Sequence, residues 1–272
     1  MTNLVLGGTG KTGRRVVNKL ESLGLPVRVG SRNGTPRFDW EDDRTWAPVL
    51  DGMSAAYIAY YPDMAAPGAA EHIGALSRLA VSMGVRRLVL LAGRGEEEGL
   101  PTEQALIDSG ADWTILRSTW IAQNFSESFL LEPVLAGEVV LPTGDIGEPF
   151  VDAEDIADVA VAAMTTEGHA GQIYELTGPR LLSFGDAVAE IARATGREIR
   201  YESVTTKEFA AMLAEGEVPA DYVEFLTELF TKVLDGRNAY LADGVKRALG
   251  REPRDFRLYA EEAAATGVWG GR

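Results

Sequence analysis

A glycine-rich turn between an apolar strand and an amphipathic helix is the strongest constraint on the fold of this chain. Gly7, Gly10 and Gly13 form a GxxGxxG spacing that follows the apolar residues 4–6 and opens a helix expected over residues 14–23. In such a turn the first glycine permits a tight bend, the second lets the backbone approach a pyrophosphate, and the third lets the helix pack closely on the strand. The N–H groups at the helix N-terminus also attract phosphate. The loop therefore predicts a dinucleotide-binding site within a βαβ unit.

Two alternatives remain for this loop. Gly10-Lys11-Thr12 is similar to the end of a Walker A phosphate loop, but that motif requires a glycine where Val5 stands inside the strand. The other alternative is a tight strand-to-helix turn that binds no ligand. On the dinucleotide interpretation, the residues expected to contact the cofactor are Gly7, Thr9, Gly10, Lys11, Thr12 and Gly13.

The end of the second expected strand indicates which dinucleotide binds. Residues 26–30 are followed by Ser31 and Arg32, with Arg37 close by and no carboxylate before Asp39. An NAD site usually has an acidic residue here, which would repel a 2′-phosphate. A serine can donate a hydrogen bond to that phosphate and an arginine can pair with it. We therefore expect NADP(H), with Asp39 beside the adenine; the alternative is that these side chains are solvated loop charges.

Apolar runs and helical patterns alternate through the first two-thirds of the chain. Strands are expected at residues 4–6, 26–30, 38–40, 55–60, 88–91 and 113–117, and helices at 14–23, 69–83 and 101–109. This alternation is typical of βαβ units. It predicts an α/β fold with a Rossmann-type doubly wound parallel sheet.

The pattern loosens after about residue 118. Helices are expected at residues 125–135, 152–164, 183–194, 206–215, 222–234, 243–249 and 254–265, and strands at 138–141, 172–176 and 199–204. We expect an NADP-binding domain over residues 1–180, in which residues 118–150 partly cross to a second lobe. A smaller, mostly helical substrate-binding lobe is expected over residues 181–272.

Charge and composition exclude several classes of function. The formal net charge of −15 opposes binding to nucleic acid or to an anionic membrane surface. The chain has no cysteine, so disulfides and thiolate catalysis are excluded, and His72 and His169 are too far apart for a zinc motif. No apolar run approaches the roughly 20 residues of a membrane span, and no signal peptide is recognisable. We expect a cytoplasmic monomer or homodimer that acts on a small molecule and holds no metal.

Several segments resemble the NmrA-like atypical short-chain dehydrogenases/reductases, in particular the quinone-oxidoreductase and triphenylmethane-reductase branch. They are the glycine loop and residues 109–117, 124–125, 151–157 and 174–178, and the resemblance covers nearly the whole chain. It implies that the cofactor is also contacted by Ala59, Tyr60, Ala92, Gly93, Ser118, Thr119 and Trp120. A substrate pocket is further expected at Trp120, Asn124 and Phe125; the alternative for Trp120 and Phe125 is that they pack the interface between the lobes.

One departure from the family pattern bears on the chemistry. The Tyr-x-x-x-Lys pair of the usual reductases falls at Gly95 and Gly99, counted back from Glu103, and the usual Ser or Thr is absent from Leu91-Ala92-Gly93. The ordinary acid machinery for reducing a ketone is therefore missing. An epimerase or dehydratase is disfavoured for the same reason, because that chemistry needs the pair to deprotonate a hydroxyl.

Two functions remain. The first is an NADPH-dependent oxidoreductase that transfers a hydride to a quinone-, imine- or enone-like acceptor, for which positioning alone can suffice. The second is a non-catalytic NADP(H)-sensing regulator. For the first, Tyr60 and Tyr61 are candidate proton donors, although either can be a pocket wall. Arg94 is a candidate for an oxyanion or for the pyrophosphate, or an idle exposed cation. Residues 96–98 form a solvated acidic face or attract cationic substrates.

Overall fold

The computed structural model describes residues 2–216, 223, 226, 227, 230, 231 and 234–270. By its internal contacts the chain divides into two compact units. The first comprises the chain up to Ser118, Ala153–Leu176 and Asp243–Glu252, and the second comprises Thr119–Asp152, Thr177–Ala242 and the chain from Pro253 onward. The helix expected over residues 222–234 lies largely outside the described residues.

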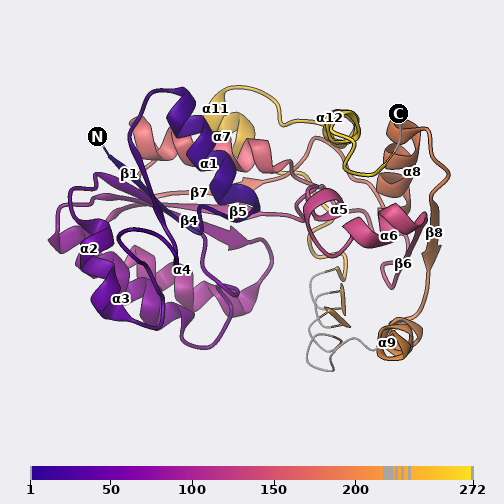
Figure 1. Cartoon of the computed structure of the whole chain (residues 1–272), viewed down its shortest axis with the longest axis horizontal. Coiled ribbons are helices and arrows are strands. Elements are labelled where there is room, and N and C mark those ends of the chain that lie inside the picture. Colours follow the sequence, from indigo (N-terminus) through magenta and orange to yellow (C-terminus); the bar gives the residue numbers. More distant parts are fainter. Residues whose placement is uncertain (1, 217–222, 224–225, 228–229, 232–233, 271–272) are drawn as a thin grey trace. The chain divides into compact units, whose positions relative to one another are not determined.

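The first unit is built on a six-stranded parallel sheet with the strand order β2-β1-β3-β4-β5-β7 (Figure 1). Its strands are β1 (Asn3–Leu6), β2 (Val27–Gly30), β3 (Ala55–Ile58), β4 (Arg87–Gly93), β5 (Asp112–Ser118) and β7 (Gln172–Leu176). The central strands are largely apolar because helices cover both faces of the sheet. The predicted Rossmann-type parallel sheet is confirmed.

Figure 1 shows which helices cover each face of this sheet. One face carries α2 (Trp46–Leu50), α3 (Ala69–Ser82) and α4 (Leu100–Ile107), and the other carries α1 (Lys11–Ser22), α7 (Ala153–Thr165) and α11 (Gly244–Leu249). On the first face, Leu88 and Leu90 of β4 join a core cluster with Ile73 and Leu76 of α3. On the second face α11 packs on α7 and β7, so the Rossmann unit includes a segment beyond the boundary expected at residue 180.

The second unit surrounds an aromatic core. Its elements are the parallel strand pair β6 (Glu138–Leu141) and β8 (Arg200–Ser203), with helices α5 (Asn124–Glu127), α6 (Leu131–Ala136), α8 (Phe184–Thr195), α9 (Thr206–Glu215) and α12 (Phe256–Ala265). The ring of Phe150 lies 5.0 Å from that of Phe184 and 5.3 Å from that of Phe256. Helix α8 begins at the capping box of Ser183 and Asp186, where the sequence places its start.

Two local predictions are wrong. Residues 38–40 form no strand: the Phe38 side chain is buried, and its N–H donates to the carbonyl of Ser31 at 2.9 Å. The continuous helix expected over residues 125–135 is divided into α5 and α6, because Ser128 adopts an extended conformation (φ −150°). The short helix α2 was not predicted, and the indole N–H of Trp46 ties its first residue to the carbonyl of Asp39 at 2.8 Å.

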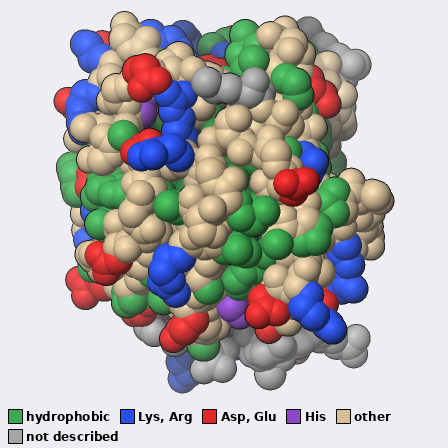
Figure 2. Space-filling view, turned by 90° about the vertical axis from the view of Figure 1, so that its left-hand side faces the viewer, with side chains coloured by type: hydrophobic (Ala, Val, Ile, Leu, Met, Phe, Trp, Pro, Cys, Tyr) green, Lys and Arg blue, Asp and Glu red, His purple; other side chains and the backbone are tan. Residues whose placement is uncertain are grey.

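One face of the molecule carries mixed charge (Figure 2). On the face in Figure 2, acidic and basic side chains are interspersed, and the described residues of that face form no continuous basic patch. Within the described parts of the chain, no helix has both the length and the apolar character needed to cross a bilayer.

Candidate functional site

The strand order places one candidate site at the carboxyl ends of β1 and β3. From β1 the chain passes to β2 on one side and then returns to β3 on the other, so the winding direction reverses between β1 and β3. In open α/β sheets, ligands bind outside the carboxyl ends of the strands at such a switch point. The loop after β1 holds the glycine motif, and the loop after β3 begins at Ala59, whose N–H donates to the carbonyl of Leu6 at 3.2 Å.

The glycine loop forms a cradle that side chains would fill. Gly7 has a positive φ of 77°, and a β-carbon added to it would lie 2.9 Å from the carbonyl oxygen of Ala59. A β-carbon on Gly13 would overlap the backbone of Gly7, because α1 starts directly against the loop. The N–H of Gly10 donates to the carbonyl of Gly7 at 2.9 Å and closes the turn, with Thr9 and Gly10 exposed. This tight backbone surface at a helix N-terminus fits a dinucleotide pyrophosphate.

Thr12 faces away from this surface. Its hydroxyl accepts a hydrogen bond from the hydroxyl of Tyr57 at 2.8 Å inside the sheet, where burial raises the pKa of Tyr57. Lys11 is half-buried at the start of α1, and its carbonyl accepts from Arg15 at 2.8 Å. The atoms that this loop exposes therefore belong mainly to its backbone. Backbone N–H groups are the groups that usually bind a pyrophosphate in such loops.

The segment after β2 brings the expected specificity residues together. The Arg32 guanidinium is exposed and lies 5.9 Å from the centre of the Tyr61 ring, which is 70% exposed. Arg37 is bound to Asp39 at 2.5 Å, so these two charges offset each other. The carbonyl of Ser31 accepts from two backbone N–H groups and fixes the turn that presents Arg32. Among the described residues, no carboxylate pairs with Arg32, in contrast to Arg37.

Tyr60 is held by an aromatic group beside α3. Its hydroxyl shares a 2.7 Å hydrogen bond with Nδ1 of His72, and its ring lies 4.6 Å from that of Trp40. Burial raises the pKa of Tyr60, and the carboxylates of Glu41 and Glu71 raise it further. A general acid is most effective when its pKa lies near the operating pH, so the raised pKa makes Tyr60 a weaker proton donor. The catalytic role expected for Tyr60 and Tyr61 stays a prediction.

A group that the sequence did not single out lies at the end of β4. A β-carbon on Gly93 would overlap the carboxyl carbon and both carboxyl oxygens of Glu96, so that carboxyl occupies the space of a side chain at position 93. Burial raises the pKa of Glu96 to about 7, and the negative charges of Asp63 and Glu98 contribute to the increase. Glu97 and Glu98 are exposed as expected, but Glu96 is not simply part of a solvated face. Nothing in a run of three glutamates distinguishes the first from the others.

Arg94 is buried rather than an exposed loop cation. Only 2% of its surface is exposed, and Nε donates to Glu175 Oε2 at 3.1 Å. Its N–H donates to the carbonyl of Ser118 at 2.9 Å, and Ser118 is the register partner of Gly93. The ends of β4, β5 and β7 are thereby joined around Arg94.

The remaining predicted residues belong to the second unit. The Thr119 hydroxyl donates to the carbonyl of Pro149 at 2.8 Å. Trp120 packs among Phe184 and Phe230, with ring centres 5.3 and 5.4 Å away, and Phe125 is completely buried. Asn124 is half-buried at the first position of α5. Phe125 is thus part of the core of this unit, and the pocket roles of Trp120, Asn124 and Phe125 stay predictions.

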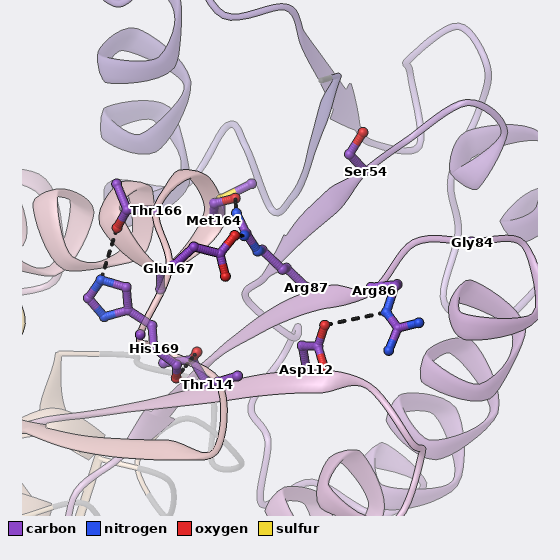
Figure 3. Close-up of a pocket in the computed structure, with 13 residues that line it drawn as sticks. Ser54, Gly84, Arg86, Arg87, Asp112, Thr114, Met164, Thr166, Glu167 and His169 are labelled. Atoms are coloured by element: carbon purple, nitrogen blue, oxygen red, sulfur yellow. Dashed lines mark hydrogen bonds and ion pairs between the residues drawn. The ribbon is translucent and has the colours of Figure 1, made fainter.

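A cavity of about 360 Å³ opens at the opposite edge of the sheet (Figure 3). It lies at the amino ends of β4 and β5, where Arg86 pairs with Asp112 at 3.4 Å and Arg87 pairs with Glu167. His169 lines this cavity and is only 9% exposed. The side chains around this cavity that carry charge are already paired with one another, and no group of three potential metal ligands occurs among the described residues. The glycine-loop edge is the better candidate site.

Comparisons with known proteins agree with this geometry. No protein-family model matches the chain. The chain is 32% identical to an agroclavine dehydrogenase of Claviceps fusiformis, over 94% of this chain and 95% of that relative. It is 28% identical to an NAD(P)H azoreductase of Xenophilus azovorans, over 96% of this chain and 98% of the relative.

Two solved structures show the same fold. An NADPH-dependent quinone oxidoreductase of Escherichia coli, complexed with NADPH, has a TM-score of 0.80 at 19% identity and covers 96% of this chain and 99% of its own. NmrA, a negative transcriptional regulator, has a TM-score of 0.71 at 17% identity, with 98% of each chain covered. The chain belongs to the NmrA-like family of atypical short-chain dehydrogenases/reductases, a group of NAD(P)H-dependent oxidoreductases.

Proposed function

We propose that this protein is an NADPH-dependent reductase of small, electron-poor organic acceptors of the quinone, imine, enone or azo type. The observation that carries the proposal is the glycine cradle at the switch point between β1 and β3. The names of the relatives support the acceptor class, since they include a clavine dehydrogenase and an azoreductase. We further propose that it acts in the cytoplasm as a monomer or homodimer.

The residues of the first unit suit the task of holding and orienting NADPH. The backbone of Gly7, Gly10 and Gly13 would hold the pyrophosphate, and Arg32 with Ser31 would bind the 2′-phosphate. When bound, the reduced nicotinamide supplies a hydride, and that chemistry belongs to the cofactor. The chain contributes position, which alone can lower a barrier by about 7–11 kcal/mol.

Titration with NADPH and NADH, followed by fluorescence, tests the cofactor part of this proposal. We expect NADPH to bind at least ~tenfold more tightly, a difference of about 1.4 kcal/mol. Equal affinities would contradict the assignment of Arg32 and Ser31, and absent binding would contradict the whole proposal. Turnover is then measured with a quinone, an N-alkyl iminium salt and an azo dye.

A non-catalytic NADP(H) sensor is the second candidate. It is favoured by Gly95 and Gly99, because they remove the residues that most reductases of this fold use for acid catalysis. A sensor would bind NADPH and reduce none of the acceptors. Any turnover that saturates with both substrates and disappears in a glycine-loop variant excludes it.

A further inference from the structure

Glu96 is the carboxylic acid that the structure places against the end of β4. The carboxyl fills the side-chain space of Gly93, within the segment Leu91-Ala92-Gly93 that lacks the hydroxyl residue of ordinary reductases. Gly93 is also the register partner of Ser118 at the end of β5. A residue with any side chain at position 93 would exclude the carboxyl from this place. The position of the Glu96 carboxyl therefore depends on the glycine at position 93.

The surroundings of Glu96 favour its protonated form. Desolvation disfavours the carboxylate, and so do the negative charges of Asp63 in the loop after β3 and of Glu98 in the adjacent turn. The nearest cation along the chain is Arg94, which donates to Glu175 at 3.1 Å. The loop after β3 packs against this region, because Thr102 donates to the carbonyl of Met64 at 2.7 Å. An acid with these neighbours keeps a proton available near neutral pH.

We propose that Glu96 is the proton donor to acceptors whose reduction needs a proton, in place of the absent tyrosine. The proposal rests on the reductase function proposed above. For an azo acceptor, a hydride from reduced nicotinamide adds to one nitrogen and the N=N π bond breaks. The second nitrogen takes the proton as the O–H bond of Glu96 breaks. The products are a hydrazine, the oxidised nicotinamide and the Glu96 carboxylate, which regains a proton from water.

Acceptors that need no proton provide an internal control. An N-alkyl iminium ion becomes a neutral amine when a hydride adds to it, so an acid contributes nothing. An azo acceptor would otherwise develop a strongly basic nitrogen anion, and general acid catalysis typically contributes ~10²–10⁴-fold in such cases. Glu96 therefore matters for one reaction and not for the other.

The test compares Glu96→Gln with the wild-type protein on an azo dye and on an N-alkyl iminium salt. We expect the variant to lose at least ~100-fold in kcat with the dye and to keep its iminium turnover. The wild-type kcat/KM with the dye should fall as the pH rises above about 7, and the profile of the variant should lack this fall. Glu97→Gln, at the exposed neighbouring position, is the matched control and should behave like the wild type.

A readout independent of turnover accompanies the kinetics. In protein labelled with carbon-13 glutamate, NMR should show one carboxyl that titrates near pH 7, and Glu96→Gln should remove that signal while NADPH binding is retained. A signal that persists in the variant would overturn the assignment.

Each kinetic outcome has a distinct meaning. Equal dye turnover in the variant and the wild type overturns the role of Glu96 and leaves the reductase function standing. Loss of both reactions with intact NADPH binding also overturns the donor role, because proton delivery cannot explain the iminium result. A wild-type protein that reduces neither acceptor overturns both proposals.

Discussion

The carboxyl group of Glu96 occupies the space that a side chain of Gly93 would take at the carboxyl end of β4. An acid three residues along the chain thus fills a place left open by a glycine. Since the carboxyl is the far end of a flexible side chain, a bulkier residue at position 93 displaces it without disturbing the backbone. A substitution of either Gly93 or Glu96 should therefore remove the carboxyl from the end of β4.

Gly93→Ala should separate the carboxyl from the end of β4. We expect the pKa of Glu96 to fall from about 7 towards 4.5, because the displaced carboxyl gains solvent. Dye reduction should weaken in the same direction as in Glu96→Gln. Carbon-13 NMR and kinetics measure the two effects, with the NADPH affinity determined in parallel because Gly93 is also an expected cofactor contact. An unchanged titration would show that the carboxyl does not depend on the glycine.

Gly13→Ala should abolish cofactor binding or unfold the first unit. The added methyl group would overlap the backbone carbonyl of Gly7, which cannot move without opening the turn. Gly10→Ala is the graded control, because its β-carbon would lie 3.3 Å from the same oxygen. Calorimetry of NADPH binding and thermal unfolding separate the two consequences. Equal affinities for Gly13→Ala and wild type would show that the loop does not approach the cofactor.

Arg32→Gln should reduce the affinity for NADPH and leave that for NADH unchanged. The guanidinium is exposed and no carboxylate among the described residues offsets it, so its charge is available to a 2′-phosphate. The loss should be at least ~tenfold, about 1.4 kcal/mol. Arg37→Gln is the control with a smaller expected effect, because Arg37 is already paired with Asp39. Parallel losses for both nucleotides would indicate that Arg32 supports the fold of the loop instead.

The ion pair of Glu103 and Arg117 should contribute to the stability of the first unit. Glu103 is 4% exposed in α4, and both its oxygens accept from the Arg117 guanidinium, at 2.9 and 2.5 Å. Removing one member of a buried pair takes away a compensating charge from the other member. Because a quarter of the Arg117 side chain is exposed, we expect Glu103→Gln to cost about 2 kcal/mol rather than the full buried value. Urea unfolding measures the loss, and Glu97→Gln serves as the exposed control.

The sheet and the glycine loop could be predicted because their signals are local. The continuous apolar run at residues 88–91 and the glycine spacing at residues 7–13 each depend on nearby residues only. The pairing of β6 with β8 and the return of α11 to the first unit depend on contacts between distant segments. A single sequence carries no pattern for such contacts.

The site was less accessible to sequence reasoning for the same reason. The absence of the tyrosine and lysine at Gly95 and Gly99 followed from the family resemblance, but the buried position of the Glu96 carboxyl could not be read from the sequence. Glu96 differs from Glu97 and Glu98 in what its side chain packs against. Arg94 differs from an exposed loop arginine in its burial and in its ion pair with Glu175. Burial and pairing, which decide the chemistry of these groups, arise after the chain has folded.

The dependence of stability on pH should report the environment of Glu96 without any ligand. Its pKa is raised from 4.5 to about 7 on folding, so between these values the folded protein keeps a proton that the unfolded chain has lost. Stability from this group is therefore fully present at low pH and is lost as the pH rises through about 7. Glutamine at this position does not titrate. The melting temperature of Glu96→Gln minus that of the wild type should therefore increase from pH 4.5 to about 7 and stay constant above that pH.

Thermal unfolding of both proteins across this range provides the measurement, with Glu97→Gln as the control. Titrating groups far from Glu96 act equally in the wild type and the variants and cancel in the difference, whereas Asp63 and Glu98 are coupled to Glu96 and belong to the measured effect. A difference that does not change with pH would mean that Glu96 is as solvated in the folded protein as in the unfolded chain. The carboxyl would then hold no proton at neutral pH, and it could not serve as the donor.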